Sequence, residues 1–104
     1  MSGQRQIEIL NGIVSAMHAS AKAGYDSMRC EFEYEANQGG WTAGAKYFYT
    51  HSGECISEHL VAAGDVYELL HELHGMMKAK TGGDWKALLI EVGEDGKAST
   101  KFNY

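Results

Sequence analysis

The chain has 104 residues, 44% hydrophobic and 22% charged, which fits one globular domain spanning residues 1–104 with a single modest core. No apolar run approaches the roughly 20 residues that a membrane-spanning helix needs. The formal net charge is −5, which argues against binding to nucleic acid or to an anionic membrane, because both require clustered basic side chains.

Residues 4–22 have the periodicity of an amphipathic helix. Its predicted apolar stripe consists of Ile7, Leu10, Ile13, Val14, Met17 and Ala21, and Gly24 is expected to end the helix. The polar residues before this stripe lack the apolar core of a secretory signal peptide, so we expect a cytoplasmic protein.

Residues 28–35 alternate apolar and polar side chains, which is typical of an antiparallel strand with one buried face. The apolar face holds Met28, Cys30, Phe32 and Tyr34, and the polar face holds Arg29, Glu31, Glu33 and Glu35. A turn at residues 37–40 leads into a second strand over residues 41–50. Phe48 has the opposite parity to Tyr47 and Tyr49, so at least one of these rings should meet solvent. Residues 55–60 are a candidate third strand.

A second helix is expected to begin at Asp65, because Asp65 and Glu68 have the spacing of a capping box. Its predicted buried stripe is Val66, Leu69, Leu70, Leu73 and Met77. A β-hairpin follows over residues 85–104, with its turn at residues 94–96, where Gly96 is free to adopt positive φ. A three-residue loop pairs Val92 with Ala98, Ile90 with Thr100, and Leu88 with Phe102.

This order predicts an α+β fold, α-β-β-(β)-α-β-β, in which an antiparallel sheet of four to five strands has two helices packed on one face. The other face, with Glu31, Glu33 and Glu35, is expected to be open to water or to a partner. The edges of such a sheet offer pairing sites, which leaves a homodimer as one possible assembly.

The acidic residues gather in the middle of the chain. Residues 31–72 hold eight acidic residues and one lysine, which suits a basic partner, although an acidic surface can also serve solubility. The candidate partner-binding residues are Glu31, Glu33, Glu35, Glu54 and Glu58 as electrostatic contacts, with Phe48 and Tyr49 as anchors.

His71 and His74 lie three positions apart on the second predicted helix, with Glu68 and Glu72 near them. The run His-Glu-Leu-His differs from the His-Glu-x-x-His of zinc hydrolases, so a solvated pair is the simpler interpretation. A small metal-binding regulator or enzyme is the alternative hypothesis. No phosphate-binding or nucleophile motif accompanies the pair, and we expect no enzymatic activity, no cofactor, and two reduced thiols at Cys30 and Cys55.

Several segments resemble the YezG-like family of bacterial immunity proteins, or antitoxins. They are Tyr47-Phe48-Tyr49, Leu69-Leu70 with Leu73, Trp85 with Leu88 and Glu91, and Gly96-Lys97 with Phe102-Asn103-Tyr104. The likeness runs from about Ile7 onward. It implies an antitoxin that binds the C-terminal domain of a cognate toxin, often a basic nuclease of polymorphic or contact-dependent growth-inhibition systems. Carboxylates would then occupy the place of the substrate phosphates.

Overall fold

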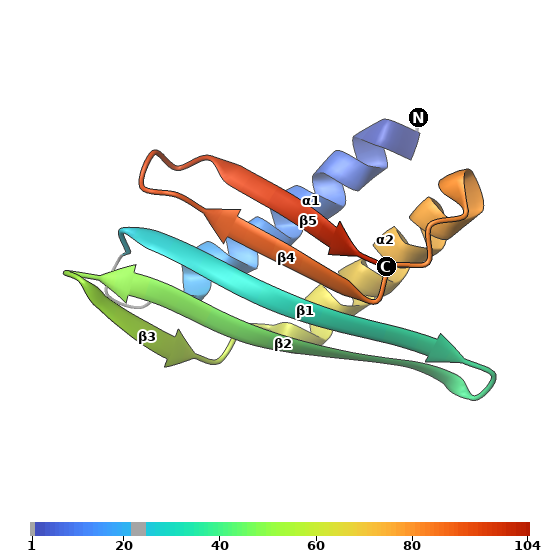
Figure 1. Ribbon diagram of the computed structural model, residues 1–104, viewed down its shortest axis with the longest axis horizontal. Helices are drawn as coiled ribbons and strands as arrows, with labels where there is room; N and C mark the ends of the chain where they lie inside the picture. The colour runs from blue at the N-terminus through green and yellow to red at the C-terminus, as the bar shows by residue number, and fades with distance from the viewer. Residues whose placement is uncertain (1, 22–24) are drawn as a thin grey trace.

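The computed structural model describes residues 2–21 and 25–104. Seven elements follow in chain order: α1 (Ser2–Ser20), β1 (Ser27–Asn37), β2 (Gly40–His51), β3 (Glu54–Glu58), α2 (Ala63–Thr81), β4 (Ala87–Val92) and β5 (Ala98–Asn103). The strands form one antiparallel sheet in the order β3-β2-β1-β4-β5, and both helices lie on the same side of it (Figure 1). The α+β prediction is confirmed, including the third strand.

The core lies between the sheet and the two helices. β1 is the central strand, and its alternation places Met28, Cys30, Phe32 and Tyr34 against the helices. The helix residues that complete the core are Ile9, Ile13 and Met17 of α1, and Val66, Leu70 and Leu73 of α2. Arg5 and Glu72 join the two helices by a double hydrogen bond at the surface. The two helices together cover one face of the sheet.

The buried stripe of α1 differs from the predicted one at its beginning. Ile7 is 61% exposed, whereas Ile9 is fully buried. Positions two apart lie on nearly opposite sides of a helix, so only one of these isoleucines can face the core. Ile9 continues the four-residue spacing of Ile13 and Met17, and this spacing prevails. The predicted end of the helix at Lys22 and Gly24 lies outside the described residues.

The start of α2 also differs from the prediction. Ala62 is the N-cap and adopts a left-handed conformation with φ 53°, and no side chain caps the helix there. Asp65 is therefore not the N-cap: it lies in the first turn, where its N–H donates to the carbonyl of Ala62 at 3.0 Å. Its negative charge is still favourable near the helix N-terminus. Gly82 ends the helix with φ 73°.

The predicted hairpin register is confirmed in full. Leu88 pairs with Phe102, Ile90 with Thr100, and Val92 with Ala98. The N–H of Gly93 donates to the carbonyl of Lys97 at 3.1 Å, which closes a loop of residues 94–96, and Gly96 has φ 80°. The tight turn between β1 and β2 is also as predicted, with Asn37 opposite Gly40.

Candidate functional site

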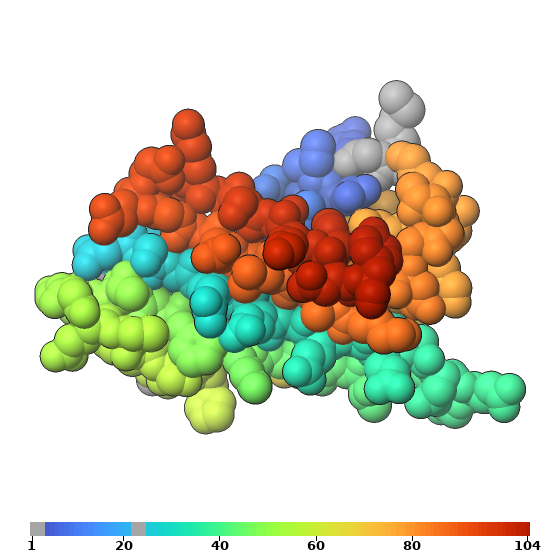
Figure 2. All heavy atoms as spheres, viewed as in Figure 1, coloured from blue at the N-terminus to red at the C-terminus, as the bar shows by residue number. Residues whose placement is uncertain are grey.

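The uncovered face of the sheet carries most of the predicted binding residues. Arg29, Glu31, Glu33 and Glu35 point away from the helices, because each follows a position of β1 that faces them. Neighbours in this row are roughly 6.5–7 Å apart along the strand. Within the described chain no helix lies on this face, and Figure 2 shows strand side chains across its width.

The unbalanced negative charge of this row lies at one end. The Arg29 guanidinium Nη2 is 3.2 Å from Glu31 Oε2, and Lys46 is the register partner of Glu31 on β2. Neither Glu33 nor Glu35 forms an ion pair with another described residue. The register of β1 with β4 ends at Glu33, so Glu35 lies on the part of the β1–β2 hairpin that extends beyond β4. Two carboxylates are thus available to a basic partner.

The two predicted anchors lie on opposite faces of the sheet. Phe48 is half-buried on the open face, where its ring centroid is 5.6 Å from Arg29 Cζ. Tyr49 is 4% exposed and packs 5.9 Å from the ring of Tyr47 on the covered face. Tyr49 belongs to the core, so its prediction as an anchor is wrong, whereas Phe48 can contact a partner.

Glu54 and Glu58 lie apart from the other predicted carboxylates. Both share the parity of Ile56 on the edge strand β3, and Ile56 packs against the core. They therefore border the covered side of the sheet and not its open face. Four of the seven predicted residues share the open face: Glu31, Glu33, Glu35 and Phe48.

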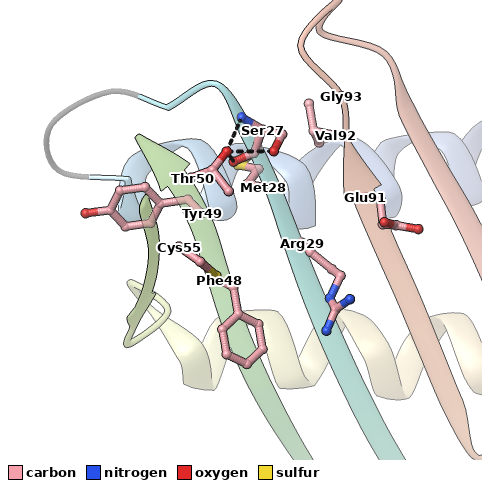
Figure 3. A pocket seen from close by; sticks show the side chains of 10 residues that line it. All are labelled: Ser27, Met28, Arg29, Phe48, Tyr49, Thr50, Cys55, Glu91, Val92 and Gly93. Carbon is pink, nitrogen blue, oxygen red and sulfur yellow. Dashed lines mark hydrogen bonds between the residues drawn. The ribbon is translucent and has the colours of Figure 1, made fainter. Parts of the chain in front are cut away.

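A transverse trough crosses the open face at the end of the sheet opposite Glu35. It encloses about 400 Å³, and Figure 3 shows its lining side chains. One row across the strands is bulky, because Phe48 and Glu91 are both register partners of Arg29. The adjacent row is small, because Thr50 is the register partner of both Ser27 and Cys55.

The trough exists because small side chains border large ones. Hydrogen bonds fix the small row: the Ser27 N–H donates to Thr50 Oγ1 at 3.1 Å, and the two hydroxyls are 2.7 Å apart. The sequence prediction missed this feature. Its one local signal is the small polar residues at the strand ends, but the register of four strands is needed to align them.

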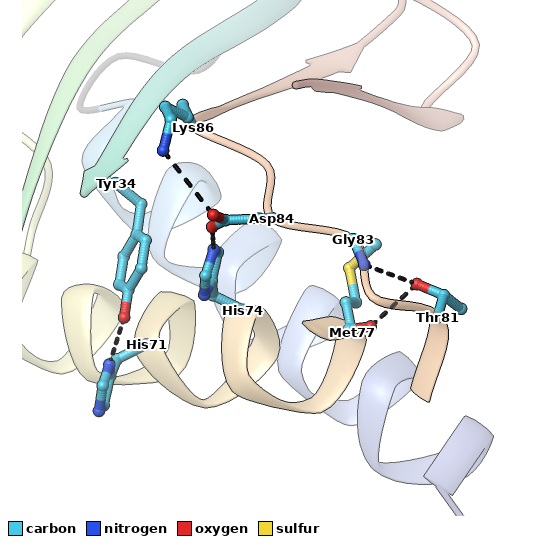
Figure 4. Close-up of polar contacts among 8 residues, drawn as sticks. All are labelled: Tyr34, His71, His74, Met77, Thr81, Gly83, Asp84 and Lys86. Atoms are coloured by element: carbon cyan, nitrogen blue, oxygen red, sulfur yellow. Dashed lines mark hydrogen bonds and ion pairs between the residues drawn. The ribbon is translucent and has the colours of Figure 1, made fainter. Parts of the chain in front are cut away.

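His71 and His74 do not converge on a common point. His71 Nδ1 is 2.6 Å from the hydroxyl of Tyr34, and its ring stacks on Trp41 at a centroid distance of 4.4 Å. His74 turns toward the loop after α2, as Figure 4 shows. Among residues 2–21 and 25–104, no group of three potential ligands could hold a metal ion. The described residues therefore provide no set of metal ligands around His71 and His74.

His74 is buried, which contradicts the interpretation of His71 and His74 as a solvated pair. It is 4% exposed and stacks on Tyr34 at 4.2 Å, with Trp85 edge-on at 5.0 Å. Its Nε2 donates to the carboxylate of Asp84 at 2.9 Å, and this hydrogen bond lowers the pKa of Asp84. Burial raises the pKa of the Tyr34 hydroxyl. These contacts hold α2 against the sheet, so a role in packing is enough to explain the cluster.

The two thiols differ in environment. Cys30 is fully buried in the core, and burial raises its pKa to about 12, whereas Cys55 is exposed in the trough. Both are free. Neither helix in the described chain is long and apolar enough to cross a membrane.

No known family model matches the chain. A stretch of 77 residues, 71% of the chain, is 34% identical to a Stenotrophomonas maltophilia protein described as "Chorionicgonadotropic hormone-like protein". The chain spans 17% of the length of that relative, so the similarity concerns one segment of a much longer protein.

Proposed function

We propose that this protein is a bacterial immunity protein that binds the C-terminal domain of a cognate toxin and blocks it stoichiometrically, without catalysis. It acts in the cytoplasm, on a toxin that is a basic nuclease. The proposal takes its class of partner from the resemblance to YezG-like antitoxins, and its binding surface from the open face of the sheet.

The observation that carries the proposal is the pair of unbalanced carboxylates on an uncovered sheet face. Glu33 and Glu35 have no ion-pair partner among the described residues, and they follow one another along the same side of β1. A nuclease binds the phosphates of its substrate with lysine and arginine side chains. Carboxylates at strand spacing can meet such cations, and the opposite charges accelerate association.

Phe48 supplies the apolar part of the same surface. Binding energy at protein interfaces is concentrated in a few buried side chains, among which aromatic residues and arginine are prominent. Phe48 is half-buried, so its ring is held by β2 while part of it remains open to a partner. The ring and the carboxylates share one face, and a single partner can cover both.

The test is co-expression with the C-terminal domain of the protein encoded immediately upstream of this chain. We expect the cells to survive only when this chain is present, and the two proteins to purify together as a complex that weakens as salt rises. A domain that is harmless alone, or that kills regardless of this chain, would contradict the proposal. Purification of a homodimer with no toxin bound would point instead to self-association, for which the sheet edges offer pairing sites.

A further inference from the structure

The charged side chains that line the trough determine the sign of charge that a ligand there should have. Arg29 is the basic residue that lines it, but its guanidinium is paired with Glu31 at 3.2 Å and lies over the ring of Phe48. Glu91 lines the opposite part and forms no ion pair with any described residue. The charge left without a partner in the trough is therefore negative.

Further acidic side chains stand at the same end of the sheet. Asp26 precedes β1, and its carboxylate accepts the N–H of Ser52 at 3.0 Å. Glu94 and Asp95 lie in the hairpin loop that follows Gly93, and both are exposed. These charges raise the local concentration of cations at the trough. The wall contributes apolar contact through Phe48, whereas the side chain of Val92 points into the core.

We infer that the trough receives an arginine side chain of the bound partner. The small row of Cys55, Thr50 and Ser27 leaves room for the aliphatic stem, and the carboxylate of Glu91 accepts the guanidinium. Arginine fits better than lysine because its planar fork binds a carboxylate through two parallel hydrogen bonds. The identity of the partner rests on the proposed function, whereas the trough and its charge do not.

In the first test, a capped tri-arginine peptide is titrated into the complete chain, and binding is monitored by the NMR signals of the backbone amides. We expect shifts at Ser27, Thr50, Cys55 and Gly93, and none with a tri-glutamate peptide. Glu91→Gln should weaken peptide binding at least fivefold. Glu68→Gln removes the same charge at an exposed position of helix α2, away from the open face of the sheet, and it should leave the affinity within twofold. Absent shifts, shifts centred on Glu33, or an unchanged affinity of Glu91→Gln would overturn the inference.

A second test fills the trough and keeps the proposed function separate. Cys55→Trp places a large ring in the trough, and Asn11→Trp places the same ring at an exposed position of helix α1, away from the open face. We expect Cys55→Trp to weaken the toxin complex more than tenfold and Asn11→Trp to leave it within threefold.

In the wild-type complex, the Cys55 thiol should react with a maleimide much more slowly than in the free chain. If the toxin complex forms but Cys55 stays reactive and Cys55→Trp binds normally, the inference about the trough is wrong and the proposed function still holds. If the peptide binds in the trough but no toxin complex forms, the inference holds and the proposed function is wrong.

Discussion

Replacing Tyr47 by phenylalanine tests how the sheet holds helix α1. Tyr47 is 2% exposed, and its hydroxyl donates a 2.7 Å hydrogen bond to the carbonyl of Met17. Met17 lies in the last turn of α1, where helix carbonyls lack a regular partner, and the N–H of Ala21 bonds instead to the carbonyl of His18. The substitution therefore leaves a buried carbonyl without its donor.

The expected loss follows mainly from this hydrogen bond, since the second contact of the hydroxyl, to Met28 Sδ at 3.5 Å, is weak. A hydrogen bond contributes a net of about 0.5–1.5 kcal/mol, but a buried acceptor left unpaired costs about 1–3 kcal/mol. The phenylalanine ring keeps the packing of Tyr47, so the cavity left behind is small. We expect Tyr47→Phe to lower the free energy of unfolding by about 1–3 kcal/mol, with a fall of several degrees in Tm.

Urea unfolding monitored by circular dichroism measures this difference in the free energy of unfolding. An unchanged slope of that free energy against urea concentration would show that the variant and the wild type unfold between the same native and denatured states. Tyr49→Phe is the matched control. Tyr49 lies two positions further along β2 on the same covered face, and its hydroxyl forms no hydrogen bond within the described residues. The control should change stability by less than about 0.5 kcal/mol. Equal losses in the two variants, or no loss in Tyr47→Phe, would refute the reasoning.

Three further predictions concern stability and reactivity. Gly75→Ala should raise the free energy of unfolding by about 0.5–1 kcal/mol, measured by urea unfolding, because Gly75 lies exposed within α2 with no neighbour near its missing Cβ. In native protein one thiol, that of Cys55, should react rapidly with Ellman's reagent, while Cys30 reacts only as the chain unfolds; two fast thiols would contradict its burial. The lowered pKa of Asp84 contributes stability above its ordinary value of 3.8, and this contribution is lost as the pH falls through the folded value. Unfolding measured across that range should therefore show a shallower acid loss in Asp84→Asn, and identical curves would contradict the role of its bond with His74.

The sheet was the most predictable part of the fold. The two-residue alternation of β1 fixes which side chains share a face, and the Gly96 turn fixes the register of β4 with β5. The buried face of α1 was less predictable, because Ile7 and Ile9 are equally apolar and only packing against the sheet selects Ile9. The burial of His74 depends on Asp84 and on rings distant in the sequence, which local periodicity does not contain.

In the candidate site, too, features within one strand were predictable, whereas features that depend on strand pairing were not. Alternation alone placed Glu31, Glu33 and Glu35 on the open face, because they belong to one strand. The prediction for Tyr49 was wrong because the sequence of β2 alone does not show which of its two faces the helices cover. That depends on the pairing of β2 with β1. The trough needs the register of four strands at once, so no local pattern could have predicted it.

The central claim is that the open face, through Glu33 and Glu35, binds a basic toxin domain. Its most direct test is calorimetric titration of the toxin domain with the double variant Glu33→Lys/Glu35→Lys. The control Glu8→Lys/Glu68→Lys makes the same change in net charge at exposed positions of the two helices. We expect the strand variant to bind more than tenfold more weakly and the helix variant to bind within threefold of wild type, with both still folded. Wild-type affinity in the strand variant, or an equal loss in both variants, would contradict the account.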